Sequence, residues 1–140
     1  MYYLIYNSYN GIIQNSYNGE RDQWLDKAVE LGNADAQYEM GNLSDDYEDA
    51  VIWYRKAAEQ GHAEAQCEMG NYYNDKGDYA QAAQWFIKAA AQDEPEAQYR
   101  LASLYSTGKG VKKDKLLAGD YYYKSATGFK ASAEKTLGKE

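Results

Sequence analysis

The residue types that most often carry chemistry in proteins are scarce in this sequence. Its single cysteine is Cys67 and its single histidine is His62. One cysteine forms no intramolecular disulfide, and this pair alone completes neither a zinc site nor a catalytic triad. Aligned with the repeats described below, Cys67 falls at a packing position in a helix and His62 falls in a turn. We expect structural roles for both, with no metal ion and no cofactor.

Two short motifs also resemble functional sites. GKGVKKD, residues 108–114, has the glycines of a phosphate-binding loop but lacks the G-x-x-x-x-G-K-[ST] spacing. The adjacent carboxylates Asp45 and Asp46 stand where a helix is expected to begin, so helix capping explains them before acid–base catalysis does. No nucleophile–base or acid–base pair emerges, and the chain is predicted not to be an enzyme.

Charge is distributed unevenly along the 140 residues, whose net charge is −7. Residues 1–98 carry 18 acidic and 6 basic side chains, and residues 99–140 carry 4 and 9, giving net charges of −12 and +5. An acidic body disfavours nucleic-acid phosphates and attracts a basic protein surface. No apolar stretch reaches the roughly 18 residues that cross a bilayer, and the N-terminus lacks the features of a secretory signal. These features predict a cytoplasmic protein that binds neither nucleic acid nor membrane.

One sequence unit recurs along the chain. Copies begin with WLDKAVELGNADAQYEMG at Trp24, WYRKAAEQGHAEAQCEMG at Trp53 and WFIKAAAQDEPEAQYRLA at Trp85, and a weaker copy begins at Tyr121. In every copy 17 residues separate this aromatic anchor from the last residue of the unit, whereas the anchor lysines stand 29, 32 and 36 residues apart: Lys27, Lys56, Lys88 and Lys124. A unit of fixed length joined by one adjustable loop is typical of packed helix–turn–helix repeats.

The periodicity within each unit predicts two helices, which we call helix A and helix B. In helix B, aromatic and small residues form one stripe, as in Trp53, Tyr54, Ala57, Ala58 and in Trp85, Phe86, Ala89, Ala90. In helix A the inward residues are small, as in Ala65, Met69, Gly70 and in Ala97, Leu101, Ala102. Rings that face alanine and glycine permit close packing, so Gly41 and Gly70 are predicted to be sites of close helix approach.

An aspartate stands seven residues before three of the aromatic anchors: Asp46, Asp78 and Asp114. Aspartate is a favoured N-cap, and its negative charge suits the N-terminal end of a helix. Each unit is therefore predicted to contain helix A, an adjustable loop, an aspartate cap, helix B and a short turn.

These residues resemble the Sel-one-like repeat (SLR) family, the relative of the tetratricopeptide repeat. The best match is AQYRLASLYSTGKGVKKDKLLAGDYYYKSA, residues 97–126, in which the pattern residues are Leu101, Tyr105, Gly108, Gly110, Val111, Asp114, Ala118 and Lys124. The departures are Ala102, Leu117 and Tyr121, and the repeats at 34–61 and 63–93 lack the G-x-G-V segment. The resemblance covers about residues 24–138. It implies an all-α, right-handed α-solenoid of about four repeats with a C-terminal capping helix.

The predicted organisation is one domain over residues 1–140. It comprises a degenerate first repeat (1–33), three further repeats (34–62, 63–94 and 95–129) and a terminal capping helix (130–140). The opening segment contains NSYNG twice, eight residues apart. Aligning Leu4 with Leu101 makes residues 1–11 a degenerate helix A, with Ser16 or Asn18 as the cap of the next helix. A small hairpin with Asn-Gly turns and a frayed terminus remain the alternatives.

With no catalytic constellation, the candidate functional residues lie on the surface. Stacked A helices usually line the concave face of a solenoid, which suits a peptide or protein element. Corresponding positions form two ladders with tyrosines nearby, and these are the candidate partner-binding residues: Glu39, Asn42, Glu68, Asn71, Tyr72, Arg100, Ser103 and Tyr105. Carboxylates flanked by amides and tyrosines suit a basic segment. Use of the convex face, or ordinary solvent exposure of these residues, stays open.

The resemblance implies a non-enzymatic protein-interaction module, an adaptor or scaffold. An immunity or inhibitor protein that neutralises a basic toxin or effector is one alternative, because the chain is small and acidic. A cell-wall-related hydrolase is a remote alternative. The chain is expected to be a monomer or a weak homodimer, since terminal repeats expose faces that can pair.

Overall fold

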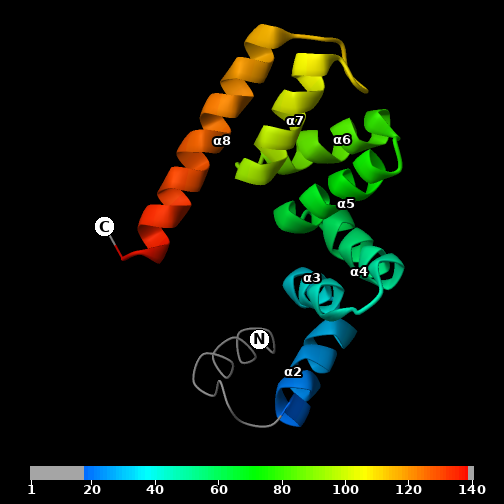
Figure 1. Ribbon diagram of the computed structural model, residues 1–140. Helices are drawn as coiled ribbons and strands as arrows, with labels where there is room; N and C mark the ends of the chain where they lie inside the picture. The colour runs from blue at the N-terminus through cyan, green and yellow to red at the C-terminus, as the bar shows by residue number, and fades with distance from the viewer. Residues whose placement is uncertain (1–17, 139–140) are drawn as a thin grey trace. The chain divides into compact units, whose positions relative to one another are not determined.

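The computed structural model describes residues 18–138, which form seven α-helices and no strand (Figure 1). The prediction of an all-α fold is confirmed. The helices are α2 (Asn18–Glu30), α3 (Ala34–Leu43), α4 (Tyr47–Glu59), α5 (Ala63–Asp75), α6 (Tyr79–Ala90), α7 (Pro95–Thr107) and α8 (Lys115–Thr136). The predictions for residues 1–17, which include the first NSYNG segment and the first three residues of the second, lie outside the described residues.

The chain divides into two compact units, Met1–His62 and Ala63–Glu140. In the described part of the first unit, α2 packs on α3 and α3 packs on α4. In the second unit each helix packs on the next, from α5 to α8, and α5 also contacts α7. Helices α3, α5 and α7 correspond to the predicted A helices, and α2, α4, α6 and α8 correspond to the predicted B helices.

The three predicted aspartate caps are confirmed. Asp46 precedes α4 and accepts a hydrogen bond from the Glu48 backbone N–H at 2.8 Å. Asp78 and Asp114 cap α6 and α8 in the same way, accepting from backbone N–H groups at 3.2 and 3.0 Å. Each carboxylate satisfies a donor that the first helical turn leaves without an intrahelical partner. These aspartates therefore fix where the B helices begin.

Helices A and B approach each other at two glycines, as predicted. A Cβ atom on Gly41 would overlap the ring of Tyr54, and one on Gly70 would overlap the ring of Phe86. Tyr54 and Phe86 are buried, whereas the preceding tryptophans of the stripe, Trp53 and Trp85, are only half-buried. The second aromatic residue of each B helix therefore forms the core contact, and the first lies at its edge.

The position at which a separate capping helix was expected to begin, residue 130, lies inside helix α8. Helix α8 runs without a break from Lys115 to Thr136, so residues 130–136 prolong helix B of the last repeat and do not form a separate helix. Two contacts tie α8 to the start of α7: the Ser125 hydroxyl donates to the Pro95 carbonyl at 2.7 Å, and Gly128 lies against the Pro95 ring. Gly128 is a weak helix former next to this position, but it lies inside α8, where the close approach of Pro95 leaves no room for a Cβ atom.

The turn that follows a B helix contains one residue in the left-handed backbone conformation, with positive φ. After α4 this residue is Gly61, with φ +93°, and the His62 N–H donates to the Ala57 carbonyl at 3.1 Å. After α6 the corresponding residue is Asp93, with φ +62°, and the Glu94 N–H donates to the Ala89 carbonyl at 3.2 Å. Both are the Schellman arrangement, in which glycine carries no steric penalty.

Replacing Gly70 by alanine is expected to lower the free energy of unfolding by about 1–3 kcal/mol, because the added methyl group meets the buried Phe86 ring. Gly119 of α8 is the matched control, since a Cβ there has no heavy atom within 4 Å. Gly119→Ala is expected to stabilise by about 1 kcal/mol through helix propensity. Urea unfolding of both variants checks this, and equal stabilisation by the two would contradict the close approach.

Asp93→Gly is expected to raise the free energy of unfolding by up to about 1 kcal/mol, because glycine adopts the left-handed conformation without strain. The reverse change at the equivalent turn, Gly61→Asp, is expected to lower it. Thermal unfolding of the two single variants measures both effects. A loss of stability in Asp93→Gly would show that the aspartate side chain contributes more than its strained backbone costs.

Candidate interaction surfaces

Cys67 is a packing residue, as predicted. It is 2% exposed and lies in the core of the second unit, where α5, α6 and α7 meet. Burial raises the pKa of the Cys67 thiol, and the negative charges of Glu96, Glu94 and Glu68 raise it further. A nucleophilic cysteine needs the opposite environment, one that favours the thiolate. The site therefore supports packing and not covalent chemistry.

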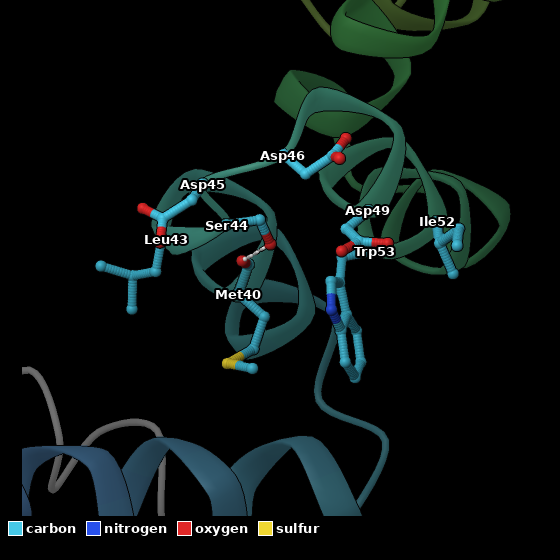
Figure 2. A pocket seen from close by; sticks show the side chains of 8 residues that line it. All are labelled: Met40, Leu43, Ser44, Asp45, Asp46, Asp49, Ile52 and Trp53. Atoms are coloured by element: carbon cyan, nitrogen blue, oxygen red, sulfur yellow. Dashed lines mark hydrogen bonds between the residues drawn. The ribbon is translucent and has the colours of Figure 1, made fainter.

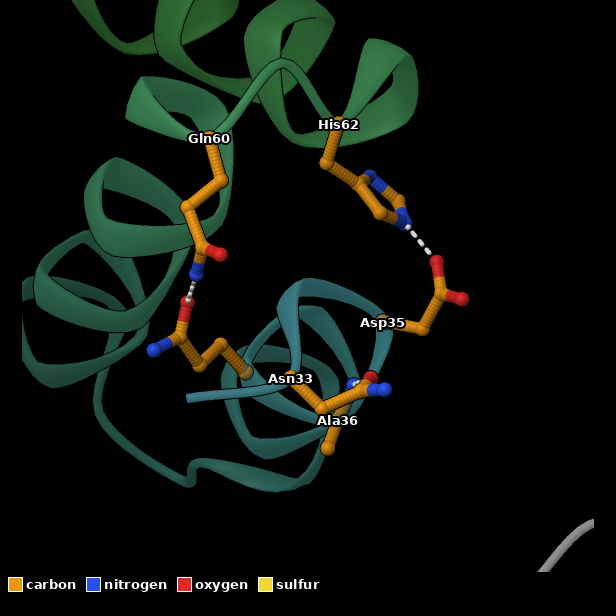
Figure 3. A network of polar contacts seen from close by, with 6 residues as sticks. Asn33, Asp35, Ala36, Gln60 and His62 are labelled. Atoms are coloured by element: carbon orange, nitrogen blue, oxygen red, sulfur yellow. Dashed lines mark hydrogen bonds and ion pairs between the residues drawn. The ribbon is translucent and has the colours of Figure 1, made fainter. Parts of the chain in front are cut away.

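His62 lies in a turn, again as predicted, and links that turn to α3 (Figure 3). Its Nε2 atom lies 2.9 Å from the Asp35 Oδ1 atom, and its ring stacks on Tyr38 with a centroid distance of 4.7 Å. Asn33 caps α3 beside it, accepting from the Ala36 N–H at 3.0 Å. These contacts hold the end of α4 against the beginning of α3 within the first unit.

A set of buried glutamines was not predicted as a feature of the repeats. Gln37, Gln66 and Gln98 occupy the same position in α3, α5 and α7, and none is more than 9% exposed. Gln60 donates to Gln37 at 2.7 Å, and Gln92 donates to Gln66 at 2.9 Å (Figure 3 shows the first pair). The sequence did contain a signal for them, because an Ala-Gln pair occupies the third and fourth positions of each A helix. Buried amides need such partners, so these glutamines are structural.

The GKGVKKD segment forms the loop between α7 and α8. Gly108 ends α7 in the left-handed conformation, and its N–H donates to the Leu104 carbonyl at 2.7 Å. A Cβ on Gly110 would overlap the backbone of Tyr79 in α6, and its φ is +71°. Both glycines are therefore required by the backbone of the second unit. The prediction that this is a structural loop is confirmed.

The anchor lysines lie over the aromatic anchors of their own helices. The Nζ atoms of Lys56, Lys88 and Lys124 lie 4.5, 4.6 and 5.5 Å from the ring centroids of Trp53, Trp85 and Tyr121. A cation above an aromatic face is attracted by the ring quadrupole, at about 0.5–1 kcal/mol for exposed pairs. This contact explains why aromatic and lysine recur three residues apart in the repeat.

In the first unit the candidate ladder residues are Glu39 and Asn42. Glu39 is half-buried and Asn42 is exposed on α3. The Asn42 side-chain oxygen accepts a hydrogen bond from the Tyr54 hydroxyl at 2.9 Å. Asn42 therefore helps to join α3 to α4, and its amide oxygen is partly used within the chain.

In the second unit three candidate ladder residues lie close to a glutamate, Glu96, that was not among the predicted site residues. Glu68 and Asn71 of α5 lie near Arg100 of α7, and Glu96 lies between them. Asn71 donates to Glu96 at 3.5 Å, and an Arg100 guanidinium nitrogen lies 3.7 Å from the same Glu96 oxygen. We call Glu68, Asn71, Glu96 and Arg100 the α5–α7 polar cluster. Glu96 occupies the position of Asp35 and Glu64 in the other repeats. This recurring acidic residue is the sequence signal that could have pointed to Glu96.

The charge balance of this cluster is incomplete. Burial raises the pKa of Glu68, and the neighbouring Glu96 charge raises it further. A hydrogen bond from Asn71 and the positive charge of Arg100 lower that pKa, but they do not offset the increase. The Glu68 carboxylate is thus held in a site where an additional cation would favour its charged form.

The remaining candidates are placed differently. Ser103 is exposed on α7, and Tyr72 of α5 is half-buried, with the Lys76 Nζ atom 5.4 Å from its ring centroid. Tyr105 packs against the core of the second unit and stacks on Tyr121, with centroids 6.0 Å apart and planes inclined by 3°. Burial raises the pKa of Tyr105, and repulsion from the ionised form of Tyr121 and from the Asp114 carboxylate raises it further. Much of its ring is therefore used for packing.

A hollow of about 490 Å³ lies in the first unit, between the end of α3 and the first turns of α4 (Figure 2). We call it the acidic hollow, and it is lined by Met40, Leu43, Ser44, Asp45, Asp46, Asp49, Ile52 and Trp53. The position of Asp45 and Asp46 before a helix predicted a capping role for them. Asp46 has that role, but Asp45 and Asp49 also contribute carboxylates to the wall of the hollow.

Paired helices, aspartate-capped B helices and glycine-mediated contacts define a helical repeat protein. The Sel1 repeat family model matches residues 34–62, 63–94 and 95–128. The chain therefore belongs to the Sel1 repeat family, whose members generally mediate protein–protein interactions.

Two solved structures are similar to this chain. One is a protective antigen present in uropathogenic Escherichia coli strains that displays an SLR fold, with 35% identity and a TM-score of 0.72 over 84% of this chain. The other is a Sel1 repeat protein from Oxalobacter formigenes, with 34% identity and a TM-score of 0.68 over 86% of this chain. The alignments span only 27% and 54% of those two chains. None of the curated proteins compared matches. Within residues 18–138, no helix has the length and apolar character that crossing a membrane requires.

Glu68→Gln is expected to stabilise the chain at pH 7 and to have no effect at about pH 3.5. The raised pKa means that the folded chain binds this proton more tightly than the unfolded chain. Stability therefore falls as the pH rises from the ordinary glutamate pKa of about 4.3 through the raised value. Glutamine removes that loss, which is below about 1 kcal/mol because a partly exposed charge is screened.

Urea unfolding at the two pH values measures this difference. Glu134→Gln, an exposed change on α8, is the control for a general effect of net charge. A Glu68→Gln variant that is less stable than the parent at pH 7 would contradict the assignment of Glu68 as a destabilised carboxylate.

Proposed function

We propose that the chain is a non-enzymatic adaptor or scaffold that binds a protein partner through the exposed face of its A helices. In the second unit this face is the α5–α7 polar cluster. In the first unit it includes Glu39 and Asn42 at the corresponding positions of α3. Membership of the Sel1 repeat family supports the interaction role, and the local chemistry supports the choice of face.

The observation that carries this proposal is the incomplete neutralisation of Glu68. The cluster holds two glutamates and one arginine, and burial together with the Glu96 charge raises the pKa of Glu68. A lysine or arginine from a partner would relieve this repulsion and form a charge-assisted hydrogen bond. The partner segment is therefore basic, which also agrees with the net charge of −12 over residues 1–98.

A second candidate function is neutralisation of one dedicated basic partner, in the manner of an immunity or inhibitor protein. The observation that favours it is the same excess of negative charge. A dedicated inhibitor forms a tight complex that persists when salt screens long-range attraction, whereas a general electrostatic contact weakens steeply. Salt dependence therefore separates this function from that of an adaptor.

Affinity capture from a native extract at low and moderate salt, with mass spectrometry of the bound proteins, tests both functions. The charge reversal Glu68→Lys is expected to weaken binding of a captured basic partner at least about tenfold, equivalent to about 1.4 kcal/mol. Glu134→Lys, the same change on the exposed surface of α8, is the matched control and is expected to bind as the parent does.

A single basic partner retained at moderate salt supports the inhibitor, and several partners support the adaptor. Equal binding by the Glu68→Lys and Glu134→Lys variants would show that the A-helix face is not the binding surface. Circular dichroism of each variant confirms that a lost partner does not reflect a lost fold.

A further inference from the structure

The acidic hollow stands where one repeat lacks a tyrosine. Counting from the aligned glycine or alanine of each A helix, Ser44 takes the position held by Tyr73 in α5 and Tyr105 in α7. Helix α3 accordingly ends at Leu43, whereas α5 and α7 continue through their tyrosines to Asp75 and Thr107. The second repeat therefore has a short A helix and a small side chain at a position that elsewhere carries a ring.

The two other repeats show what the tyrosine does. Tyr105 stacks on Tyr121, which is the aromatic anchor of its own helix B. Tyr73 packs against the core of the second unit. The anchor at the corresponding position in the second repeat is Trp53, and both Trp53 and Ser44 line the hollow. The Ser44 hydroxyl donates to the Met40 carbonyl at 2.7 Å, so this side chain does not fill the space.

The walls of the hollow combine one aromatic ring, aliphatic surface and carboxylates. Figure 2 shows Met40 and Trp53 extending from α3 and α4 on the same side, with Asp49 close to Trp53. Leu43 and Ile52 are 48% and 55% exposed, which is high for aliphatic residues at the rim of a cavity. Lys56 lies over the Trp53 ring but is not among the residues that line the hollow.

The carboxylates are available for a ligand. Within residues 18–138, the side-chain carboxylates of Asp45 and Asp49 form no hydrogen bond and no ion pair. The Asp46 Oδ1 atom accepts the hydrogen bond that caps α4, which leaves the Oδ2 atom to face a ligand. Three carboxylates around an aromatic wall attract a cation that also has a flat surface.

We propose that the acidic hollow binds an arginine side chain of a partner protein. The guanidinium group is planar, remains charged, stacks on aromatic rings and pairs with carboxylates through two parallel hydrogen bonds. It would take the place of the missing tyrosine against Trp53, while Asp45 or Asp49 accepts its hydrogen bonds. A lysine offers the charge without the plane, and an aromatic side chain offers the plane without the charge. Arginine is the side chain that meets both requirements of the site.

This inference rests on the proposed role in protein binding, but it does not depend on the α5–α7 polar cluster. The two sites use different residues and are tested with different variants. Loss of the cluster interaction would leave arginine binding intact, and failure of arginine binding would leave the A-helix face as the proposed surface.

The test is a titration of the full chain with N-acetyl-arginine amide and, separately, with N-acetyl-lysine amide. The NMR chemical shift of the Trp53 indole N–H is monitored during each titration. We expect the arginine probe to shift this resonance with a dissociation constant in the millimolar range, at least about fivefold lower than that of the lysine probe. Equal affinities, or the absence of a shift, would overturn the proposal.

Ser44→Tyr is the decisive variant, because it restores the residue that the other repeats carry. It is expected to abolish the shift with arginine while leaving the melting temperature equal or higher. Ser132→Tyr, on the exposed surface of α8, is the matched control and is expected to bind arginine as the parent does. Retained binding in folded Ser44→Tyr would overturn the proposal.

Asp49→Asn provides a second variant should Ser44→Tyr fail to fold. It keeps the shape of the side chain and removes its charge, and it is expected to weaken arginine binding at least about threefold. Unchanged affinity in both Asp49→Asn and the corresponding Asp45→Asn variant would show that the carboxylates do not hold the guanidinium group, and the proposal would then be wrong.

Discussion

The structure of each unit depends on the contact between a glycine of helix A and a buried ring of helix B. Gly41 meets Tyr54 in the first unit, and Gly70 meets Phe86 in the second. Because glycine has no side chain, the ring packs directly on the backbone of the neighbouring helix. The rest of the core then consists largely of alanines, which fit between helices at this spacing. A core of this kind holds the helices close together, so a longer helix or a larger side chain at these positions is poorly tolerated.

The polar side chains close to this core form hydrogen bonds within the chain. Near the helix ends, the capping aspartates accept hydrogen bonds from backbone N–H groups, and the buried glutamines are hydrogen-bonded to other glutamines. The loop glycines allow the chain to pass close to neighbouring backbone. Residues that look functional in the sequence, such as His62, Asn42 and the glycine loop, contribute to this internal network.

Two local groups of side chains form the surfaces proposed here. In the second unit, Glu96 and Arg100 stand together on α7 beside Glu68 and leave an acidic site incompletely neutralised. In the first unit, a serine replaces a tyrosine and opens a hollow beside Trp53. In both cases the repeat supplies a rigid frame, and a few side chains on that frame supply the chemistry. This separation allows a repeat protein to alter its binding surface without altering its core.

The sequence by itself determined the elements that depend on local pattern. The 17-residue interval, the aspartate before each B helix and the small residues facing aromatic rings predicted the paired helices, their caps and the two close approaches. Tertiary structure decided which polar side chains meet. The insertion of Glu96 between Asn71 and Arg100 depends on the packing of α5 and α7, and a ladder of aligned positions cannot give it. The hollow beside Trp53 likewise exists only because α3 and α4 hold their side chains apart where a ring is missing. Helix formation and capping follow from residues a few positions apart in one helix, whereas each proposed site is made by side chains that the packing of separate helices brings together.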